Sequence, residues 1–183
     1  MRLGLMLALA VALSASSSAY FPAGLSAQSG AGAGAADWSA SKETLKPMVD
    51  LKLQDLKGKS FDSGSLKGSI LVVDFWATWC GPCMTEVPQF NELQRKYADK
   101  GVKVVGVAMA SGPVEEVKPF RDRFNMKYSV LVGDDDQQYD LNIVGYPTTY
   151  LVTKDWKVYD VYIGAGPSKA RKIEAGIKKL LGS

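Results

Sequence analysis

After residue 46, apolar residues along the chain follow two spacings, one typical of strands and one typical of helices. Largely apolar runs cover residues 70–77 and 102–109, as in central parallel strands that are covered on both faces. Between these runs, apolar residues recur every three or four positions and predict an amphipathic helix: Val87, Phe90, Leu93 and Tyr97. This strand–helix–strand order predicts an α/β fold around a central sheet.

Further elements are predicted on both sides of this unit. Upstream, Val49, Leu51 and Leu53 alternate with polar residues, and a turn at 57–59 leads into a short return strand, which together predict a hairpin. Downstream, the pattern predicts a helix at 115–124, a strand at 128–132, a short helix or loop at 139–144, an antiparallel hairpin of strands 148–152 and 158–163, and a last helix capped by Ser168.

The N-terminal residues have the layout of a secretory signal peptide. Arg2 precedes an apolar run at 3–13 and a tract of small residues at 14–19. The run is shorter than the roughly 20 residues of a membrane-spanning helix. We therefore assign residues 1–27 to a signal peptide, and place the protein outside the cytoplasm, either periplasmic or secreted. An uncleaved membrane anchor and a buried N-terminal helix are the alternatives.

Between the signal peptide and the folded part, the composition changes to small residues. From Ser29 to Ala36 the sequence contains only Gly, Ala and Ser, which cannot bury enough surface to fold. We therefore expect a flexible linker at 28–46 and one folded domain at 47–183.

Composition and charge exclude several classes of function. With 46% hydrophobic and 22% charged residues, the chain is an ordinary globular protein. Its net charge of +3 is too weak to indicate binding to nucleic acid. No histidine is present, which excludes Ser-His-Asp and Cys-His catalysis and histidine-ligated metals. Two cysteines supply half of a four-ligand zinc site, so zinc is not expected in a monomer. We expect the protein to be monomeric.

The two cysteines are the strongest chemical signal. Cys80 and Cys83 lie at a predicted strand-to-helix turn, with Pro82 at a position favoured in the first helical turn. The free N–H groups and dipole of the helix would stabilise a thiolate at Cys80. We therefore expect Cys80 to be an exposed nucleophile and Cys83 a more buried resolving thiol. The alternatives are two inert core thiols or a structural disulfide, although so short a loop constrains the unfolded chain little.

Asp74 is the second candidate, because it is an ionisable residue in an apolar strand, six positions before Cys80. A buried carboxylate is unfavourable unless it is protonated or paired, so a raised pKa would suit it to exchange a proton with Cys83 through water. The alternative is a structural aspartate.

Residues 73–83 closely resemble thioredoxin, and the longer context resembles extracytoplasmic reductases of the TlpA/ResA type. The resemblance implies a thioredoxin-like fold: a central mixed sheet flanked by helices, an N-terminal hairpin, and a central βα insertion within the long interval from Cys83 to Pro147. Thioredoxins carry a lysine on the neighbouring strand, which 104–109 does not match, and ResA-like proteins carry an acid between the cysteines, where this chain has Gly81-Pro82.

The segment 144–149 matches the cis-proline loop of the same family. By resemblance, Pro147 packs against the dithiol and the backbone of Tyr146 pairs with an extended substrate. Trp79 is expected to provide apolar surface for docking, while Gly81 and Pro82 set the redox potential, as in the reductant thioredoxin at about −270 mV.

The resemblance implies a thiol–disulfide oxidoreductase that reduces protein disulfides through a redox-active Cys80–Cys83 pair, without a cofactor. A membrane-linked thiol donor would reduce it again, and cytochrome c maturation is the commonest role in the family. The alternatives are a disulfide oxidase or isomerase, or a non-catalytic binding module or chaperone.

One acidic segment faintly resembles a calcium loop, with alternating Asp134, Asp136, Gln138 and Asp140. It lacks the required glycine and has Gly145 at the position of the final glutamate, so we expect a solvated loop.

Overall fold

The computed structural model describes residues 45–182, which form seven strands and three α-helices. The strands are β1 (Lys52–Gln54), β2 (Ser60–Asp62), β3 (Ile70–Trp76), β4 (Val102–Ala108), β5 (Ser129–Gly133), β6 (Thr148–Val152) and β7 (Val158–Ile163). The α-helices are α1 (Gly81–Tyr97), α2 (Val114–Arg123) and α3 (Lys169–Leu181), and the 3₁₀ turns are η2 (Ser63–Leu66), η3 (Ala98–Lys100) and η4 (Asp135–Gln138). The predicted α/β class and the order of the elements are confirmed.

All seven strands join one mixed sheet in the order β2-β1-β5-β4-β3-β6-β7. Strand β3 is an inner strand next to the central β4, parallel to β4 and antiparallel to β6. This register places Asp74 of β3 between Gly106 of β4 and Thr149 of β6. Beyond α1, the interval between the cysteines and Pro147 contains β4, α2 and β5.

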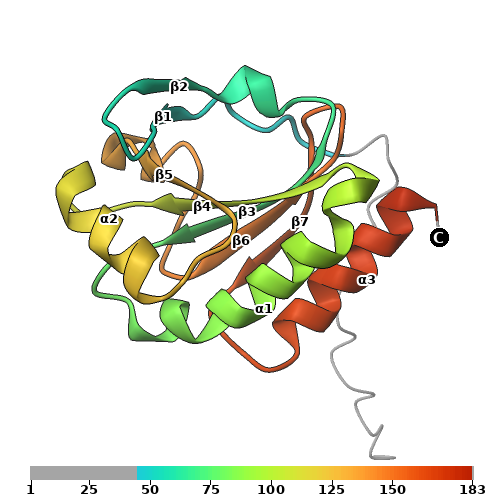
Figure 1. Cartoon of the computed structure of the whole chain (residues 1–183). Helices are drawn as coiled ribbons and strands as arrows, with labels where there is room; N and C mark the ends of the chain where they lie inside the picture. Colours follow the sequence, from blue (N-terminus) through green and yellow to red (C-terminus); the bar gives the residue numbers. More distant parts are fainter. Residues whose placement is uncertain (1–44, 183) are drawn as a thin grey trace, which may run out of the picture. The chain divides into compact units, whose positions relative to one another are not determined.

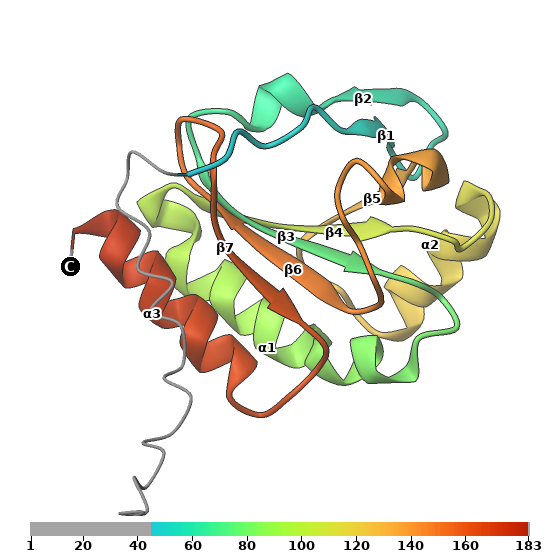
Figure 2. The same cartoon turned by 180° about the vertical axis from the view of Figure 1, so that it is seen from behind.

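The two faces of the sheet are covered differently. One face packs against the α-helices, through Val87 and Phe90 of α1, Val117 of α2, and Ile173 and Ile177 of α3. The opposite face is covered by the N-terminal segment with Met48 and Leu51, by η2 with Leu66, by the loop before β6 with Leu141, and by the β6–β7 turn with Trp156. Figure 1 and, from behind, Figure 2 show α1 and α3 side by side on one face and the β1–β2 hairpin beyond the other.

Side chains alternate along β3, which decides which face receives its polar residue. Val73 and Phe75 belong to the core opposite the helices, whereas Val72 and Trp76 belong to the core under them. Asp74 therefore points toward α1 and α3. The helix-covered face is the one that carries a buried charge.

One local prediction needs correction. The predicted strand from residue 49 is shorter, because β1 covers only Lys52–Gln54 and the side chain of Val49 is exposed. Segment 139–144, predicted as a short helix or a loop, is a loop, and a helical turn, η4, lies just before it. The side chain of Asp134 accepts a hydrogen bond from the N–H of Asp136 and so caps η4.

The β6–β7 hairpin forms as predicted, with an unusual residue in its turn. Trp156 has a φ of 61°, in the left-handed region that favours glycine. Its ring is buried against the apolar core of the sheet, and its backbone N–H donates to the Thr153 carbonyl. Packing of the ring therefore offsets the unfavourable backbone conformation.

Lys46, which the sequence analysis assigned to the linker, is bonded to the folded domain: its carbonyl accepts a hydrogen bond from the N–H of Val158. The predicted signal peptide and the rest of the predicted linker lie outside the described residues. Within residues 45–182, no helix is both long enough and apolar enough to cross a membrane.

Candidate active site

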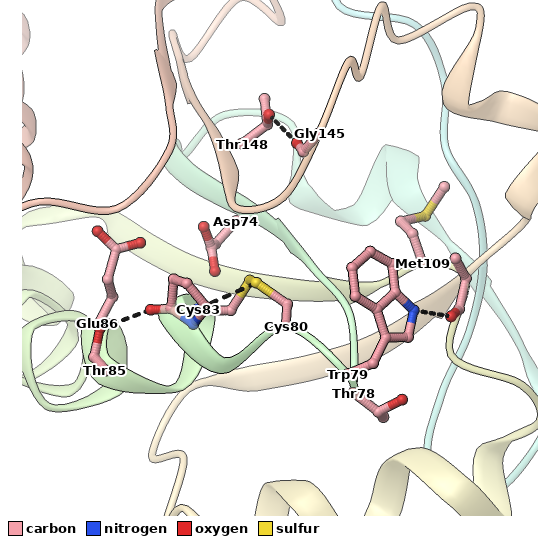
Figure 3. The surroundings of a disulfide bond; sticks show 12 residues. Asp74, Thr78, Trp79, Cys80, Cys83, Thr85, Glu86, Met109, Gly145 and Thr148 are labelled. Atoms are coloured by element: carbon pink, nitrogen blue, oxygen red, sulfur yellow. Dashed lines mark hydrogen bonds between the residues drawn. A yellow bond between two sulfur atoms is a disulfide. The ribbon is translucent and has the colours of Figure 1, made fainter.

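The two cysteines lie where β3 turns into α1. Strand β3 ends at Trp76, a turn closes with a hydrogen bond from the Cys80 N–H to the Ala77 carbonyl, and α1 begins at Gly81. Cys80 is the N-cap of α1 and Cys83 lies in its first turn. The two form a disulfide with an S–S distance of 2.00 Å (Figure 3), so the structure shows the oxidised form.

The start of α1 supplies a favourable environment for negative charge on Cys80. The backbone N–H of Cys83 points at the Cys80 sulfur at 3.3 Å. The same N–H also donates to the Cys80 carbonyl at 3.2 Å, so the sulfur shares this donor, in the place where a capping oxygen would accept. The dipole of this 17-residue helix adds to the effect.

The predicted exposure of Cys80 is wrong for the oxidised protein. Cys80 is 4% exposed and Cys83 is 2% exposed, so both are buried and differ little. The bond to Cys83 holds the Cys80 sulfur against the first turn of α1, and both residues belong to the core cluster under the helices. The exposed residue at this turn is Trp79, at 67%.

The loop before β6 lies next to this turn. The Tyr146–Pro147 peptide bond is cis, as the resemblance implied. The ring of Tyr146 meets the ring of Trp79 edge to face, with 5.6 Å between centroids. Trp79 donates from Nε1 to the Ala110 carbonyl at 2.9 Å, and Tyr146 donates from its hydroxyl to Gln138 Oε1 at 2.7 Å. These bonds fix both rings beside the cysteine turn.

Asp74 is buried on the helix side of β3, and its side chain points toward the first turn of α1 (Figure 3). The hydroxyl of Thr149 donates to Asp74 Oδ1 at 2.6 Å. Burial raises the pKa of the Asp74 carboxyl from 3.8 to about 7, against the opposing effects of Lys169 and of the Thr149 hydrogen bond. Asp74 can therefore both accept and release a proton near neutral pH.

Two charged residues that the sequence analysis did not single out complete this cluster. Lys169 is the first residue of α3, and its ammonium nitrogen lies 2.8 Å from Glu86 Oε2 and 3.9 Å from Asp74 Oδ1. Both Lys169 and Glu86 are buried. Three ionisable side chains from β3, α1 and α3 thus meet beneath the cysteine turn.

A signal for these residues is present in the sequence. Lys169 precedes Ile173 and Ile177 at intervals of four, and so lies on the apolar face of the last helix. Glu86 likewise precedes Phe90 by four positions on the apolar face of the first helix. Two opposite charges on apolar faces of neighbouring helices predict a buried pair, because an unpaired charge would be unfavourable there.

The acidic segment before β6 is engaged in the fold. Asp135 Oδ1 accepts a hydrogen bond from the Ala110 N–H at 2.5 Å. The side chain of Gln137 accepts from the Lys52 N–H through Oε1 and donates to the Asp50 carbonyl through Nε2. Among residues 45–182, no group of three or more Cys, Asp or Glu side chains is arranged to hold a metal ion.

Comparison with known proteins identifies the family of the chain. The family model described as Redoxin matches residues 40–178. The chain is 32% identical over 145 residues to the thiol-disulfide oxidoreductase ResA of Bacillus anthracis, covering 77% of this chain and 82% of that protein. It is also 32% identical over 121 residues to the thioredoxin-like protein YneN of Bacillus subtilis, covering 66% of this chain and 71% of that protein.

A solved structure shows the same architecture. The thiol:disulfide interchange protein, a thioredoxin family protein from Chlorobium tepidum, matches with a TM-score of 0.64 and 28% identity, covering 75% of this chain and 97% of that one. With the sheet, the cysteine turn and the facing proline loop in place, the chain belongs to the Redoxin family and is a thioredoxin-like protein of the TlpA/ResA type.

Proposed function

We propose that this thiol–disulfide oxidoreductase reduces protein disulfides outside the cytoplasm. The position of Cys80 as N-cap of α1, with its sulfur facing the Cys83 N–H, is the observation that carries the proposal. A thiol in this environment ionises more readily than a free thiol, and the thiolate is the nucleophile in disulfide exchange.

The reaction uses both cysteines in two exchanges. The Cys80 thiolate attacks one sulfur of a substrate disulfide, forming a Cys80–substrate disulfide and releasing the other substrate sulfur as a thiolate. The Cys83 thiolate then attacks the Cys80 sulfur, which forms the Cys80–Cys83 disulfide and releases the second substrate thiolate. The substrate gains two electrons and two protons, and the protein loses them.

Asp74 is proposed as the proton partner of Cys83. Its carboxyl is buried on the side of β3 that faces the first turn of α1 and has a pKa of about 7. As a carboxylate it can take the Cys83 proton, through water, before the second exchange. In the opposite direction it can return that proton when the disulfide is reduced again.

The surface beside the cysteine turn is proposed to bind the substrate. The backbone of Tyr146, before Pro147, would pair with an extended substrate segment, as in strand addition. Trp79, which is largely exposed, offers apolar surface next to that segment. Gly81 and Pro82 are proposed to set the start of α1, and so the stability of the thiolate.

The cellular setting is proposed from the sequence. The signal-peptide pattern at 1–27 supports a location outside the cytoplasm, where a reductase needs a membrane-linked thiol donor to stay reduced. Cytochrome c maturation is the pathway in which we propose to look first for substrates.

Reduction of insulin by dithiothreitol tests the activity. We expect the wild-type protein to accelerate the precipitation of reduced insulin. In the presence of the Cys80→Ser variant, insulin should precipitate at the uncatalysed rate. Equal rates for the two proteins would favour a binding module and overturn the proposal. A dithiol potential near that of DsbA, about −120 mV, would instead indicate an oxidase. Cys83→Ser should then retain partners as mixed disulfides, and their identity would name the pathway.

A further inference from the structure

Lys169 occupies a position that is unfavourable for a lysine unless other groups stabilise its charge. It is the first residue of α3, where the positive end of the helix dipole repels a cation. It is also buried, which removes the hydration of its ammonium group. Glu86 compensates for part of this, since its carboxylate accepts a hydrogen bond from Lys169 at 2.8 Å. The ring of Phe90 adds a weaker attraction, with its centroid 5.8 Å from the ammonium nitrogen.

The sheet itself leaves no room for a cation beside Asp74. The residue paired with Asp74 on β4 is Gly106. A Cβ at Gly106 would lie 3.0 Å from the Tyr128 ring and 3.1 Å from Trp76 Nε1, so a side chain there would require two buried aromatic residues to shift. The cation beside Asp74 comes instead from the helix layer, where the Lys169 ammonium nitrogen lies 3.9 Å from Asp74 Oδ1.

We propose that Lys169 is a positioning residue for the disulfide exchange: held in place by Glu86, its ammonium group keeps the carboxylate form of Asp74 available to accept the Cys83 proton. The inference rests on the proposed function and assigns to α3 a part in the chemistry at the cysteine turn.

The groups that surround Asp74 are consistent with this role. Glu86 of α1 faces it with a negative charge, Lys169 of α3 with a positive charge, and Thr149 of β6 with a hydroxyl donor. The Tyr128 hydroxyl also faces the cluster, and burial raises its pKa so that it stays neutral. Lys169 is thus the one cation among the groups that act on Asp74 in the described part of the chain, and its effect on Asp74 exceeds that of Glu86.

The electrostatic consequence has a definite sign. Burial and the Glu86 charge both favour the protonated form of Asp74, whereas Lys169 favours the carboxylate. Without Lys169, Asp74 would hold its proton through neutral pH and could not take one from Cys83. With Lys169, a substantial fraction is ionised at pH 7.

Lys169→Met tests the proposal, since methionine keeps most of the side-chain volume and removes the charge. The titration of Asp74 is followed directly by NMR of its carboxyl carbon in the reduced protein, and the release of substrate from the Cys80 mixed disulfide is followed against pH. We expect both midpoints to rise by about 1–3 pH units, and the release rate at pH 7 to fall at least about tenfold.

Lys172→Met is the matched control, because Lys172 is exposed on the same helix. It should leave both midpoints at the wild-type values. Unchanged midpoints in Lys169→Met would overturn the proposal, because a purely structural lysine lowers stability without moving an Asp74 titration.

A double variant keeps the test valid if Lys169→Met does not fold. Lys169→Met with Glu86→Gln removes the buried pair as a unit, which proteins often tolerate. Because Lys169 acts on Asp74 more strongly than Glu86 does, the midpoint of Asp74 in the double variant should lie above that of wild type. A midpoint at or below wild type would overturn the inference.

Failure of the proposed function would look different. If the wild-type protein did not reduce disulfides, the release assay would be flat for every variant. The NMR titration of Asp74 would still show whether Lys169 controls its protonation.

Discussion

Helices α1 and α3 are joined by two ion pairs of the same chemistry in opposite surroundings. Near the start of both helices, Glu86 meets Lys169 with side chains that are 3% and 6% exposed. Further along, Lys96 meets Glu174, with side chains that are 47% and 25% exposed. Since both pairs connect the same two helices, the difference between them isolates the effect of solvent.

Solvent access changes what each pair does to its neighbours. At the exposed pair, the hydrogen bond from Lys96 lowers the pKa of Glu174 to about 2, so the acid is charged at any ordinary pH. At the buried pair, the single cation is shared by two carboxylates, and burial raises the pKa of Asp74 to about 7. Only the buried pair therefore leaves a group that titrates near neutral pH.

The largest expected effect is a gain in stability from Asp74→Asn at alkaline pH. In the folded protein Asp74 keeps its proton up to about pH 7, whereas the unfolded chain releases it near 3.8. The stabilising contribution of the protonated carboxyl is thus complete below pH 4 and is lost as the pH rises through 7. An asparagine, which cannot ionise, should raise the free energy of unfolding above pH 8 by up to about 4 kcal/mol.

Urea denaturation at pH 4 and at pH 8.5 would measure this gain. The advantage of Asp74→Asn should disappear at pH 4, where wild type is protonated too. The same variant should slow the Cys83-dependent exchange, so stability and activity would change in opposite directions. An equal effect on stability at both pH values would contradict the assigned ionisation.

Glu86→Gln should act in the opposite direction, although Glu86 belongs to the same cluster. Removing its charge leaves the buried Lys169 with only Asp74, at 3.9 Å, as a charged partner. We expect a loss of about 2–3 kcal/mol at pH 8, less than the ~3–5 kcal/mol for a lysine left without any partner. The midpoint of Asp74 should also fall, because the repulsion from Glu86 is gone.

Glu92→Gln is the matched control for that variant. Glu92 is exposed on α1 and pairs with Arg95, so its loss should change stability by less than about 1 kcal/mol. If Glu86→Gln were as mild as Glu92→Gln, the buried pair would contribute no more than a surface pair.

The parts of the site that lie close together in the sequence were predictable. Asp74, Cys80 and Cys83 fall within one strand, one turn and one helical turn, so local rules place them. Lys169 follows much later, and a lysine at a helix start is ordinarily exposed. Its spacing from Ile173 and Ile177 places it on the apolar face of α3, but its 3.9 Å distance from Asp74 depends on how α3 packs on α1, which that spacing does not specify.

The cis bond before Pro147 and the burial of Cys80 did not follow from local sequence patterns. Most X–Pro bonds are trans, so only the family resemblance indicated the cis bond before Pro147. The burial of Cys80 was missed because exposure was inferred from reactivity, whereas the disulfide holds the sulfur against α1. The sheet and helices, by contrast, followed from the periodicity of their apolar residues.

The smallest expected effect is at the exposed pair, and it completes the comparison. Glu174→Gln removes the charge that pairs with Lys96 but keeps an oxygen that can accept from the Tyr97 hydroxyl. We expect a loss of less than about 1 kcal/mol at pH 7, because solvent already screens the pair. This loss should vanish in 1 M salt, where the screening length is about 3 Å, whereas the loss in Glu86→Gln should persist.

Acid should separate the two pairs further. The depressed pKa of Glu174 stabilises the folded protein above its ordinary value of 4.5, and this contribution disappears as the pH falls through about 2. Wild type and Glu174→Gln should therefore converge in acid, while wild type and Asp74→Asn converge already at pH 4. If salt abolished the effects of Glu86→Gln and Glu174→Gln equally, solvent would reach both ends of the α1–α3 contact. The distinction between a structural ion pair and one that controls Asp74 would then be lost.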